Sequence, residues 1–213
     1  MKWFAKRSVT ADLPLADLTA VVLDLETTGL KSQQDHILAI AAYLIHGREI
    51  NVSAGFEASL YLSTHKPSEA TLVHGITATE VGFGEEPRQA LIRFQAFIEG
   101  LPIFAFHAPF DQAFLLRAYK QTLRHTLSNI FIDVAELAGM LCPDLIKRPS
   151  LDDCISYFGL SIVGRHQAYA DAWVTAELVL ILLTKAQQQG IHTLLQLTTR
   201  LQQWQALQAM HGH

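Results

Sequence analysis

Residues 20–29 read AVVLDLETTG, and this stretch decides the fold. It opens with a short apolar run rich in β-branched residues, which is typical of a buried strand, and the Thr-Thr-Gly that follows is typical of a turn. Because side chains alternate along a strand, Asp24 and Glu26 point to one face while Leu23 and Leu25 point to the other. The stretch therefore predicts a buried strand with two acidic side chains side by side near its end.

The closeness of Asp24 and Glu26 has two interpretations. Like charges at the end of a buried strand are unfavourable unless a cation or a proton relieves them, so a divalent metal site is one explanation. A frayed strand end whose carboxylates are solvated by water is the other. The pair by itself leaves both interpretations open.

Further apolar stretches predict a β-meander followed by alternating strands and helices. Strands are predicted at residues 37–45 and 50–62, with His46 and Gly47 as the hairpin turn, and at residues 103–106 and 131–133. Helices are predicted at residues 87–98, 109–119, 134–141 and 168–188, from Ser150 to near Gly159, and after Gly190. This alternation predicts an α/β fold with some parallel strand pairing and helices that cover the sheet.

The composition predicts one cytoplasmic domain with no membrane span. A chain of 213 residues with 50% apolar content can bury a sizeable core. Its longest apolar run, residues 37–45, is much shorter than the roughly 20 residues that cross a bilayer. The first residues, MKWFAKRSVT, lack the apolar segment of a secretory signal. Cys142 and Cys154 have neither the number nor the spacing of a disulfide framework or a zinc site.

The formal net charge of −4 gives the chain no overall attraction to a polyanion. Any contact with nucleic acid must therefore come from a local patch or from bound cations.

Three more polar residues stand out near predicted helix starts. Asp111 is the only acid in the stretch FHAPFDQAFL, residues 106–115, and His166 precedes Asp171 by five residues at the head of the long helix. Taken singly, each has an ordinary explanation, because the helix macrodipole favours an acid in the first turn and a lone histidine is commonly a surface residue.

Taken together, these segments resemble a known family. D-x-E-T-T-G, then F-D-x-x-F-L, then H-x4-D at the head of a helix are similar in order and spacing to the three motifs of the DEDDh 3′-to-5′ exonucleases. That family includes the proofreading subunit of bacterial DNA polymerase III, RNase T and oligoribonuclease. The resemblance runs from about residue 19 to residue 184. It implies a ribonuclease H-like mixed β-sheet flanked by helices, with the active site at the strand ends.

The resemblance also implies a division of the chain. Residues 1–18 would be an N-terminal extension, and residues 19–186 the exonuclease domain. Residues 187–213 would form an amphipathic helix that either packs on the core or docks a partner, such as a polymerase or another protein.

The chemistry that the resemblance implies uses four carboxylates and one histidine. Asp24, Glu26, Asp111 and Asp171 would hold two divalent ions, Mg²⁺ or Mn²⁺, which suit all-oxygen ligation and stabilise the attacking and leaving oxygens of a phosphoryl displacement. His166 would be the general base, because an ordinary imidazole pKa near ~6.5 suits proton transfer near neutral pH. The implied reaction removes nucleoside 5′-monophosphates from the 3′ end of a single strand.

The resemblance further implies that Thr27, Leu30, His74 and Phe110 contact the terminal nucleotide, although the last three are also ordinary packing residues. One position departs from the family: His107 stands where many relatives carry Asn. The change is expected to alter a hydrogen bond or the shape of the loop, and a histidine ligand for zinc is a further alternative.

Other readings of the sequence remain. The motif Asp-Leu-Glu-Thr-Thr-Gly is more similar to that of the DNA proofreading relatives than to that of oligoribonuclease. This similarity favours DNA over RNA as the substrate. D-x-E-T also resembles the nucleophile segment of haloacid dehalogenase-like phosphatases, but the second acid there is Asp, not Glu. The non-enzymatic alternative is a catalytically silent binding module of a polymerase assembly.

Overall fold

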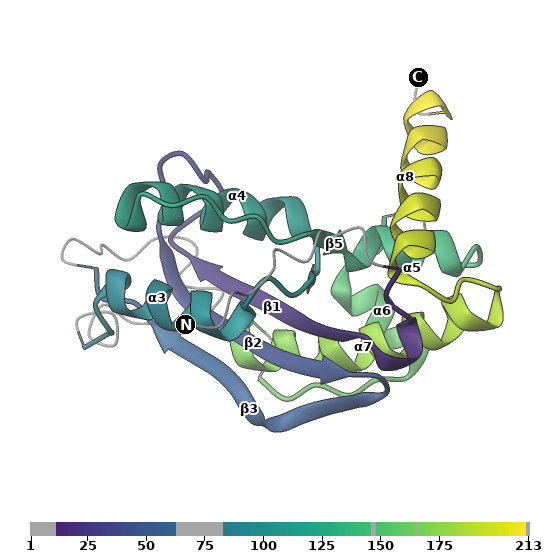
Figure 1. The fold of residues 1–213 in the computed structure, drawn as a ribbon, viewed down its shortest axis with the longest axis horizontal. Helices are drawn as coiled ribbons and strands as arrows, with labels where there is room; N and C mark the ends of the chain where they lie inside the picture. Colours follow the sequence, from purple (N-terminus) through teal and green to yellow (C-terminus); the bar gives the residue numbers. More distant parts are fainter. Residues whose placement is uncertain (1–11, 63–82, 146–147, 165, 212–213) are drawn as a thin grey trace, which may run out of the picture.

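A five-stranded mixed sheet forms the centre of the fold, with helices on both faces (Figure 1). The computed structural model describes residues 12–62, 83–145, 148–164 and 166–211. The strands are β1 (Thr19–Thr27), β2 (Ile37–His46), β3 (Glu49–Ser59), β4 (Ile103–Ala105) and β5 (Phe131–Asp133), in the spatial order β3-β2-β1-β4-β5. The first three are antiparallel neighbours, and β4 and β5 run parallel to β1. This arrangement confirms the predicted meander and the ribonuclease H-like fold class.

The helices follow the predicted order. They are α3 (Pro87–Ile98), α4 (Ala108–Ala118), α5 (Val134–Leu141), α6 (Leu151–Phe158), α7 (Ala168–Gln188) and α8 (Leu194–His211), with a 3₁₀ turn η1 (Leu15–Asp17) and a π-helical turn η2 (Tyr119–Leu123). The division into residues 1–18, 19–186 and 187–213 stays a prediction.

Three local predictions were off by a few residues. The strand predicted over residues 50–62 ends at Ser59, and the next residue makes only an isolated bridge to Glu85. The helix predicted over residues 109–119 continues into η2. The hairpin turn is formed by Gly47 and Arg48, because His46 is still paired with β3. Gly47 has a φ of 58°, and a Cβ atom there would lie 2.6 Å from a backbone oxygen of η1.

Residues of β1 divide the core into two layers. Val21, Leu23 and Leu25 pack with α3 and α4, whereas Ala20 and Val22 pack with α5, α6, α7 and α8. Figure 1 shows α4 on one side of the sheet and α7 on the other. Because alternate residues face opposite sides, the remaining even-numbered positions of β1, Asp24 and Glu26, lie on the side of α7.

Small residues let α7 approach the sheet closely. Ala168 and Ala172 of α7 form a buried cluster with Ala39 and Ala41 of β2. Beside them, the ring of Tyr43 meets the ring of Trp173 edge-on, with 5.3 Å between the ring centroids. With only methyl groups between helix and strand, the first turns of α7 lie directly on the sheet.

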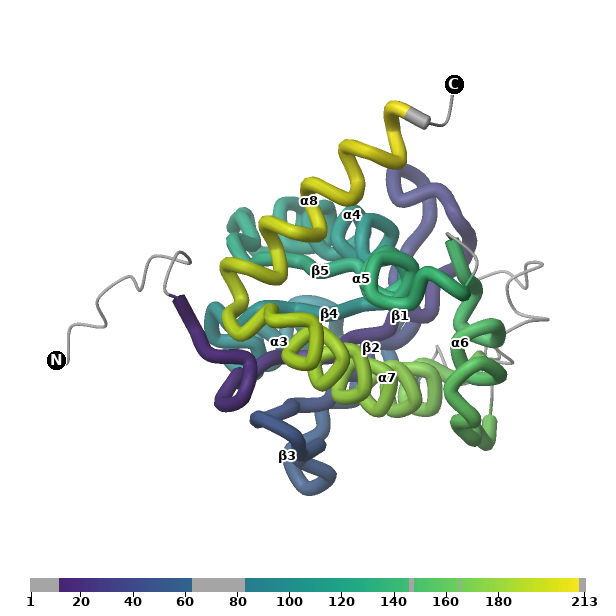
Figure 2. The backbone as a smooth tube through the Cα atoms, turned by 90° about the vertical axis from the view of Figure 1, so that its right-hand side faces the viewer, coloured from purple at the N-terminus to yellow at the C-terminus, as the bar shows by residue number. Residues whose placement is uncertain are grey.

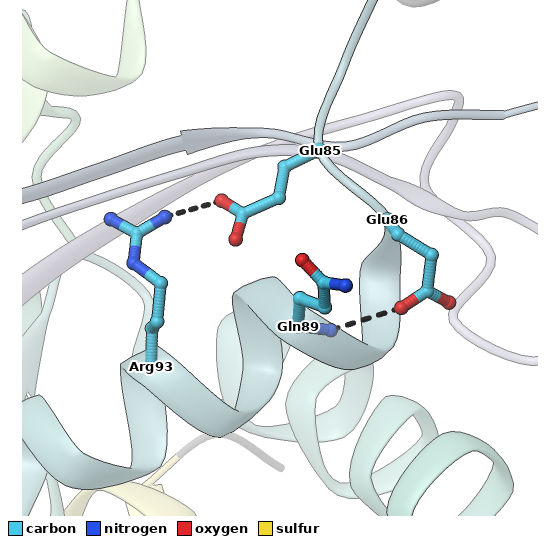
Figure 3. A network of polar contacts seen from close by, with 4 residues as sticks. All are labelled: Glu85, Glu86, Gln89 and Arg93. Atoms are coloured by element: carbon cyan, nitrogen blue, oxygen red, sulfur yellow. Dashed lines mark hydrogen bonds and ion pairs between the residues drawn. The ribbon is translucent and has the colours of Figure 1, made fainter.

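Figure 3 shows the polar contacts at the start of α3, and the amide of Glu85 just before the helix donates a hydrogen bond to the carbonyl oxygen of Ser59, the last residue of β3, at 2.7 Å. The Glu86 carboxylate accepts a hydrogen bond from the Gln89 amide at 3.0 Å, which caps the helix, and Arg93 forms an ion pair with Glu85. The Arg93 guanidinium also lies over the Phe56 ring, 5.1 Å from its centroid. Exposed pairs of this kind contribute little, so the helix is held mainly by its buried side chains. These are Ala90, Leu91, Phe94 and Ile98.

The C-terminal helix α8 belongs only partly to the core. Leu194, Leu197 and Leu201 are buried in the same cluster as α5 and α7, whereas Leu207 and Met210 are exposed. Figures 1 and 2 show the outer end of α8 pointing away from the other helices. Within the part of the chain that the structure describes, none of the helices has the length and apolar content needed to span a membrane.

Candidate active site

Three of the predicted metal ligands meet where β1 ends and α7 begins. Asp24, Glu26 and Asp171 each offer a carboxylate oxygen, and these atoms all lie within 4.8 Å of one another. Asp171 is buried, and the other two are half-buried. Three negative charges this close, with limited access to water, repel one another strongly unless protons or cations compensate them. Their all-oxygen donor set fits a hard divalent cation.

Asp171 reaches this cluster because of where α7 starts. The helix begins at Ala168, so Asp171 lies in its first turn, where the positive end of the macrodipole favours a carboxylate. The alanine contacts with β2 bring that turn against the sheet. The side-chain alternation of β1 and the close packing of α7 together produce the cluster.

Asp111 lies in the first turn of α4 and is outside this group of three. Its side chain is 3% exposed, and burial raises its pKa well above the ordinary value. Backbone hydrogen bonds from its own amide and from Leu25 lower the pKa, while the charges of Asp133 and Glu26 raise it further. Asp111 is therefore close to the same end of β1, and a bound cation would favour its ionised form.

Asp133 is a further buried acid near the site, although the sequence motifs assigned it no role there. It ends β5 and caps α5, with its Oδ1 accepting a hydrogen bond from the Glu136 amide at 3.1 Å. Burial raises the pKa of Asp133, and the nearby His107 opposes that rise. An Asp directly before an apolar helical segment is the signal that marks this cap.

His166 lies on the connection between α6 and α7. Its side chain is exposed, and its backbone adopts a left-handed conformation with a φ of 64°. The structure thus separates the two members of the H-x4-D motif, because Asp171 joins the carboxylates and His166 stays in solvent.

The residues predicted to contact a nucleotide have different surroundings. Leu30, in the loop after β1, is 85% exposed. Thr27 is buried, and its hydroxyl donates to the carbonyl oxygen of Gly29 at 2.8 Å, so it stabilises the turn. Phe110 is half-buried and packs on Phe114 with 4.8 Å between ring centroids. His74 lies outside the described residues.

Phe110 also lines a cleft of about 470 Å³ beside the site. The other residues that line the cleft are His107, Pro109, Asp133, Ala135, Glu136 and Arg148.

The backbone conformation at His107 suits a histidine. His107 precedes α4 with φ 60° and ψ 49°, a left-handed conformation in which Asn, Asp and His are enriched among residues other than glycine. A histidine therefore meets the backbone requirement of this position. The group of potential metal ligands found among the described residues does not include His107.

Comparison with known proteins identifies the family. The sequence model of the exonuclease (RNase T) family matches residues 21–179. A DNA polymerase III PolC-type from Streptococcus suis is 33% identical over 192 residues, which cover 90% of this chain and 13% of the polymerase. A DNA polymerase III subunit epsilon-like protein from Rhodobacter capsulatus is 33% identical over 190 residues, or 87% of this chain and 27% of that protein. The chain thus spans a small part of these relatives' length.

Solved structures share the fold. The crystal structure of E. coli exonuclease I in complex with a dT13 oligonucleotide aligns with a TM-score of 0.68 and 18% identity, covering 81% of this chain and 42% of that chain. The family match extends from β1 into α7 and includes both members of the Asp24–Asp171 pair. With that match over most of its length, the chain belongs to the exonuclease (RNase T) family.

Proposed function

We propose that this protein is a metal-dependent 3′-to-5′ exonuclease that releases nucleoside 5′-monophosphates from the end of a single strand. The observation that carries the proposal is the convergence of Asp24, Glu26 and Asp171 within 4.8 Å, in a chain that belongs to an exonuclease family.

Four carboxylates are proposed to hold two divalent cations, Mg²⁺ or Mn²⁺. These are the cluster of Asp24, Glu26 and Asp171, together with Asp111, which accepts a hydrogen bond from the backbone of Leu25 and is close enough to Glu26 to feel its charge. When bound, such ions supply positive charge that stabilises the attacking and leaving oxygens of a phosphoryl displacement. They would also reconcile the chain's net charge of −4 with a polyanionic substrate.

His166 is proposed as the general base. It would take a proton from the attacking water while the water oxygen bonds to phosphorus and the bond from phosphorus to the 3′ oxygen breaks. The 3′ oxygen leaves with a proton, so the products are a nucleoside 5′-monophosphate and a strand with a new 3′ hydroxyl. Its exposed place on the connection before α7, five residues before Asp171, supports this role.

DNA is the proposed polymer. Two relatives carry names of DNA polymerase III proteins, and a structural neighbour is described with a dT13 oligonucleotide. Thr27, Leu30, His74 and Phe110 are proposed to contact the terminal nucleotide. A polymerase partner is proposed to dock on the outer end of α8, where Leu207 and Met210 are exposed.

The test is degradation of matched single-stranded DNA and RNA, each labelled at the 3′ end or at the 5′ end, with Mg²⁺, Mn²⁺ or EDTA. Stepwise shortening from the 3′ end, with mononucleotide release that EDTA abolishes, is the expected result, and DNA should be the faster polymer. Faster loss of RNA would assign the RNA-directed alternative. No cleavage of either polymer by folded, metal-supplied protein would overturn the proposal in favour of a binding module.

A further inference from the structure

We propose that Arg117 is a positioning residue for the terminal nucleotide, because it fixes the loop of residues 28–36 that carries Leu30, four residues after Glu26. The inference rests on the proposed exonuclease function and names a residue that lies outside all three motifs.

Arg117 ties the loop to α4 through two charged hydrogen bonds. The side chain is half-buried in the last turn of α4. Its Nη1 atom donates to the carbonyl oxygens of Ser32, at 2.6 Å, and Asp35, at 2.7 Å. Hydrogen bonds from an ionised donor belong to the stronger class, and the rigid guanidinium holds both carbonyls at once.

The loop is folded around the Asp35 side chain, so that its backbone behaves as one unit. The Asp35 carboxylate accepts hydrogen bonds from the Lys31 amide at 2.8 Å and from the Thr28 hydroxyl at 3.3 Å. The Thr28 hydroxyl oxygen in turn accepts from the His36 amide at 2.9 Å. Gly29 completes the turn, since a Cβ atom there would lie 2.7 Å from the Asp35 carboxylate. Because these hydrogen bonds hold the loop together, a change in the Arg117 hydrogen bonds is expected to shift the loop as a whole.

The first turn of α4 also carries two other residues of the proposed site, Phe110 and Asp111. Arg117 thus sets the place of Leu30 relative to Asp111. Leu30 is 85% exposed and comes four residues after Glu26, which suits an apolar side chain that packs on the face of a nucleobase. Without the two Arg117 hydrogen bonds, the loop would keep its internal turn but lose its fixed distance from α4.

The test compares Arg117→Met with Arg117→Lys and with Arg88→Met as a matched control. The Arg88 side chain also donates from Nη1 to a carbonyl oxygen, that of Thr122 at 2.8 Å, but it does not contact the loop. For a 5′-fluorescein-labelled single-stranded oligothymidylate with Mg²⁺, Arg117→Met should raise KM about tenfold with kcat within about twofold. Arg117→Lys should recover part of that loss, because lysine keeps the charge but not the planar fork.

Arg88→Met should leave KM at the wild-type value. A merely structural role for Arg117 predicts instead a lower melting temperature with no change in KM, and that result would overturn the proposal. A fall in kcat alone would also overturn it, because the effect would then lie at the carboxylates.

Binding in Ca²⁺, followed by fluorescence anisotropy of the same oligonucleotide, separates this inference from the exonuclease proposal. If the wild type binds without cleaving in Mg²⁺, the proposed activity fails, and a Kd about tenfold weaker for Arg117→Met would still support the positioning role. An equal Kd for the two proteins would overturn that role.

Discussion

The carboxylates of Asp24 and Asp171 lie within 4.8 Å of each other, although one stands on the first strand and the other on α7. Their closeness depends on the packing of α7 on β2 through alanine side chains. Two acids held together by the fold are mutually unfavourable when both are ionised, so the same packing that builds the cluster makes it require compensation by a proton or a cation.

Asp24→Asn and Asp171→Asn are nearly isosteric changes that remove one charged ligand each. We expect turnover to fall by more than about 10²-fold. Loss of a residue that only hydrogen-bonds to a metal ligand already lowers activity about 10–100-fold, and these residues would contact the ions directly. Oligonucleotide degradation in Mg²⁺ measures the loss. Asp17→Asn, at an exposed acid in η1, is the control and should keep full activity. Full activity of either site variant would remove the carboxylate cluster from the mechanism.

His166→Ala should lower kcat by about 10²–10⁴-fold, the range expected when a general base is lost. The rise in melting temperature caused by Mg²⁺ should persist, because the proposed metal ligands are intact. Single-turnover kinetics measure the loss of kcat, and thermal melting with and without Mg²⁺ measures the stabilisation by the metal. His192→Ala, at an exposed position, is the control. If the Mg²⁺-induced rise disappeared in His166→Ala, the histidine would be a ligand and not the base.

Asp111→Asn should stabilise the metal-free protein at neutral and alkaline pH while abolishing turnover. Burial raises the folded-state pKa of Asp111 well above its unfolded value, which is about 3.9. The folded state therefore binds a proton where the unfolded state does not, and stability falls as pH rises from about 4 through the raised pKa. Asparagine carries no charge and avoids this fall.

Melting curves in EDTA test the sign of this effect. Near pH 8 the variant should melt about 2–4 °C higher than the wild type for each ~1 kcal/mol by which the buried Asp111 charge destabilises the wild type. The difference in melting temperature between the two proteins should shrink toward about pH 4. A variant that melts lower than wild type near pH 8 would show that the Asp111 charge is already compensated by the protein.

Leu197→Ala and Leu207→Ala should differ in their effect on the free energy of unfolding. Leu197 is buried in the main core cluster, so its truncation should cost about 2–5 kcal/mol, whereas Leu207 is exposed and should cost less than about 0.5 kcal/mol. Urea unfolding measures both. Equal costs would mean that α8 packs along its whole length or not at all. Catalysis per folded molecule should be unchanged in Leu207→Ala.

The sequence by itself determined where the helices and strands lie, because those signals act between close neighbours in the chain. Pro87 and Gly100 bracket α3, and the apolar run before Thr27 predicts β1. The alternation of β1 likewise places Asp24 and Glu26 on one face, since the period of a strand is two residues. The end of β3 at Ser59 and the π-helical extension of α4 depend on contacts between distant parts of the chain, which local sequence patterns do not contain.

Only the tertiary structure decided which acids meet and how deeply each is buried. Asp171 reaches Asp24 because four alanines let α7 lie on the sheet, and the pKa of Asp111 rises because the folded chain buries its carboxyl group. The hold of Arg117 on the loop after β1 has no sequence signal, because its partners are backbone carbonyls, which every residue possesses. Close packing between elements distant in sequence sets these distances, and local periodicity carries no information about them.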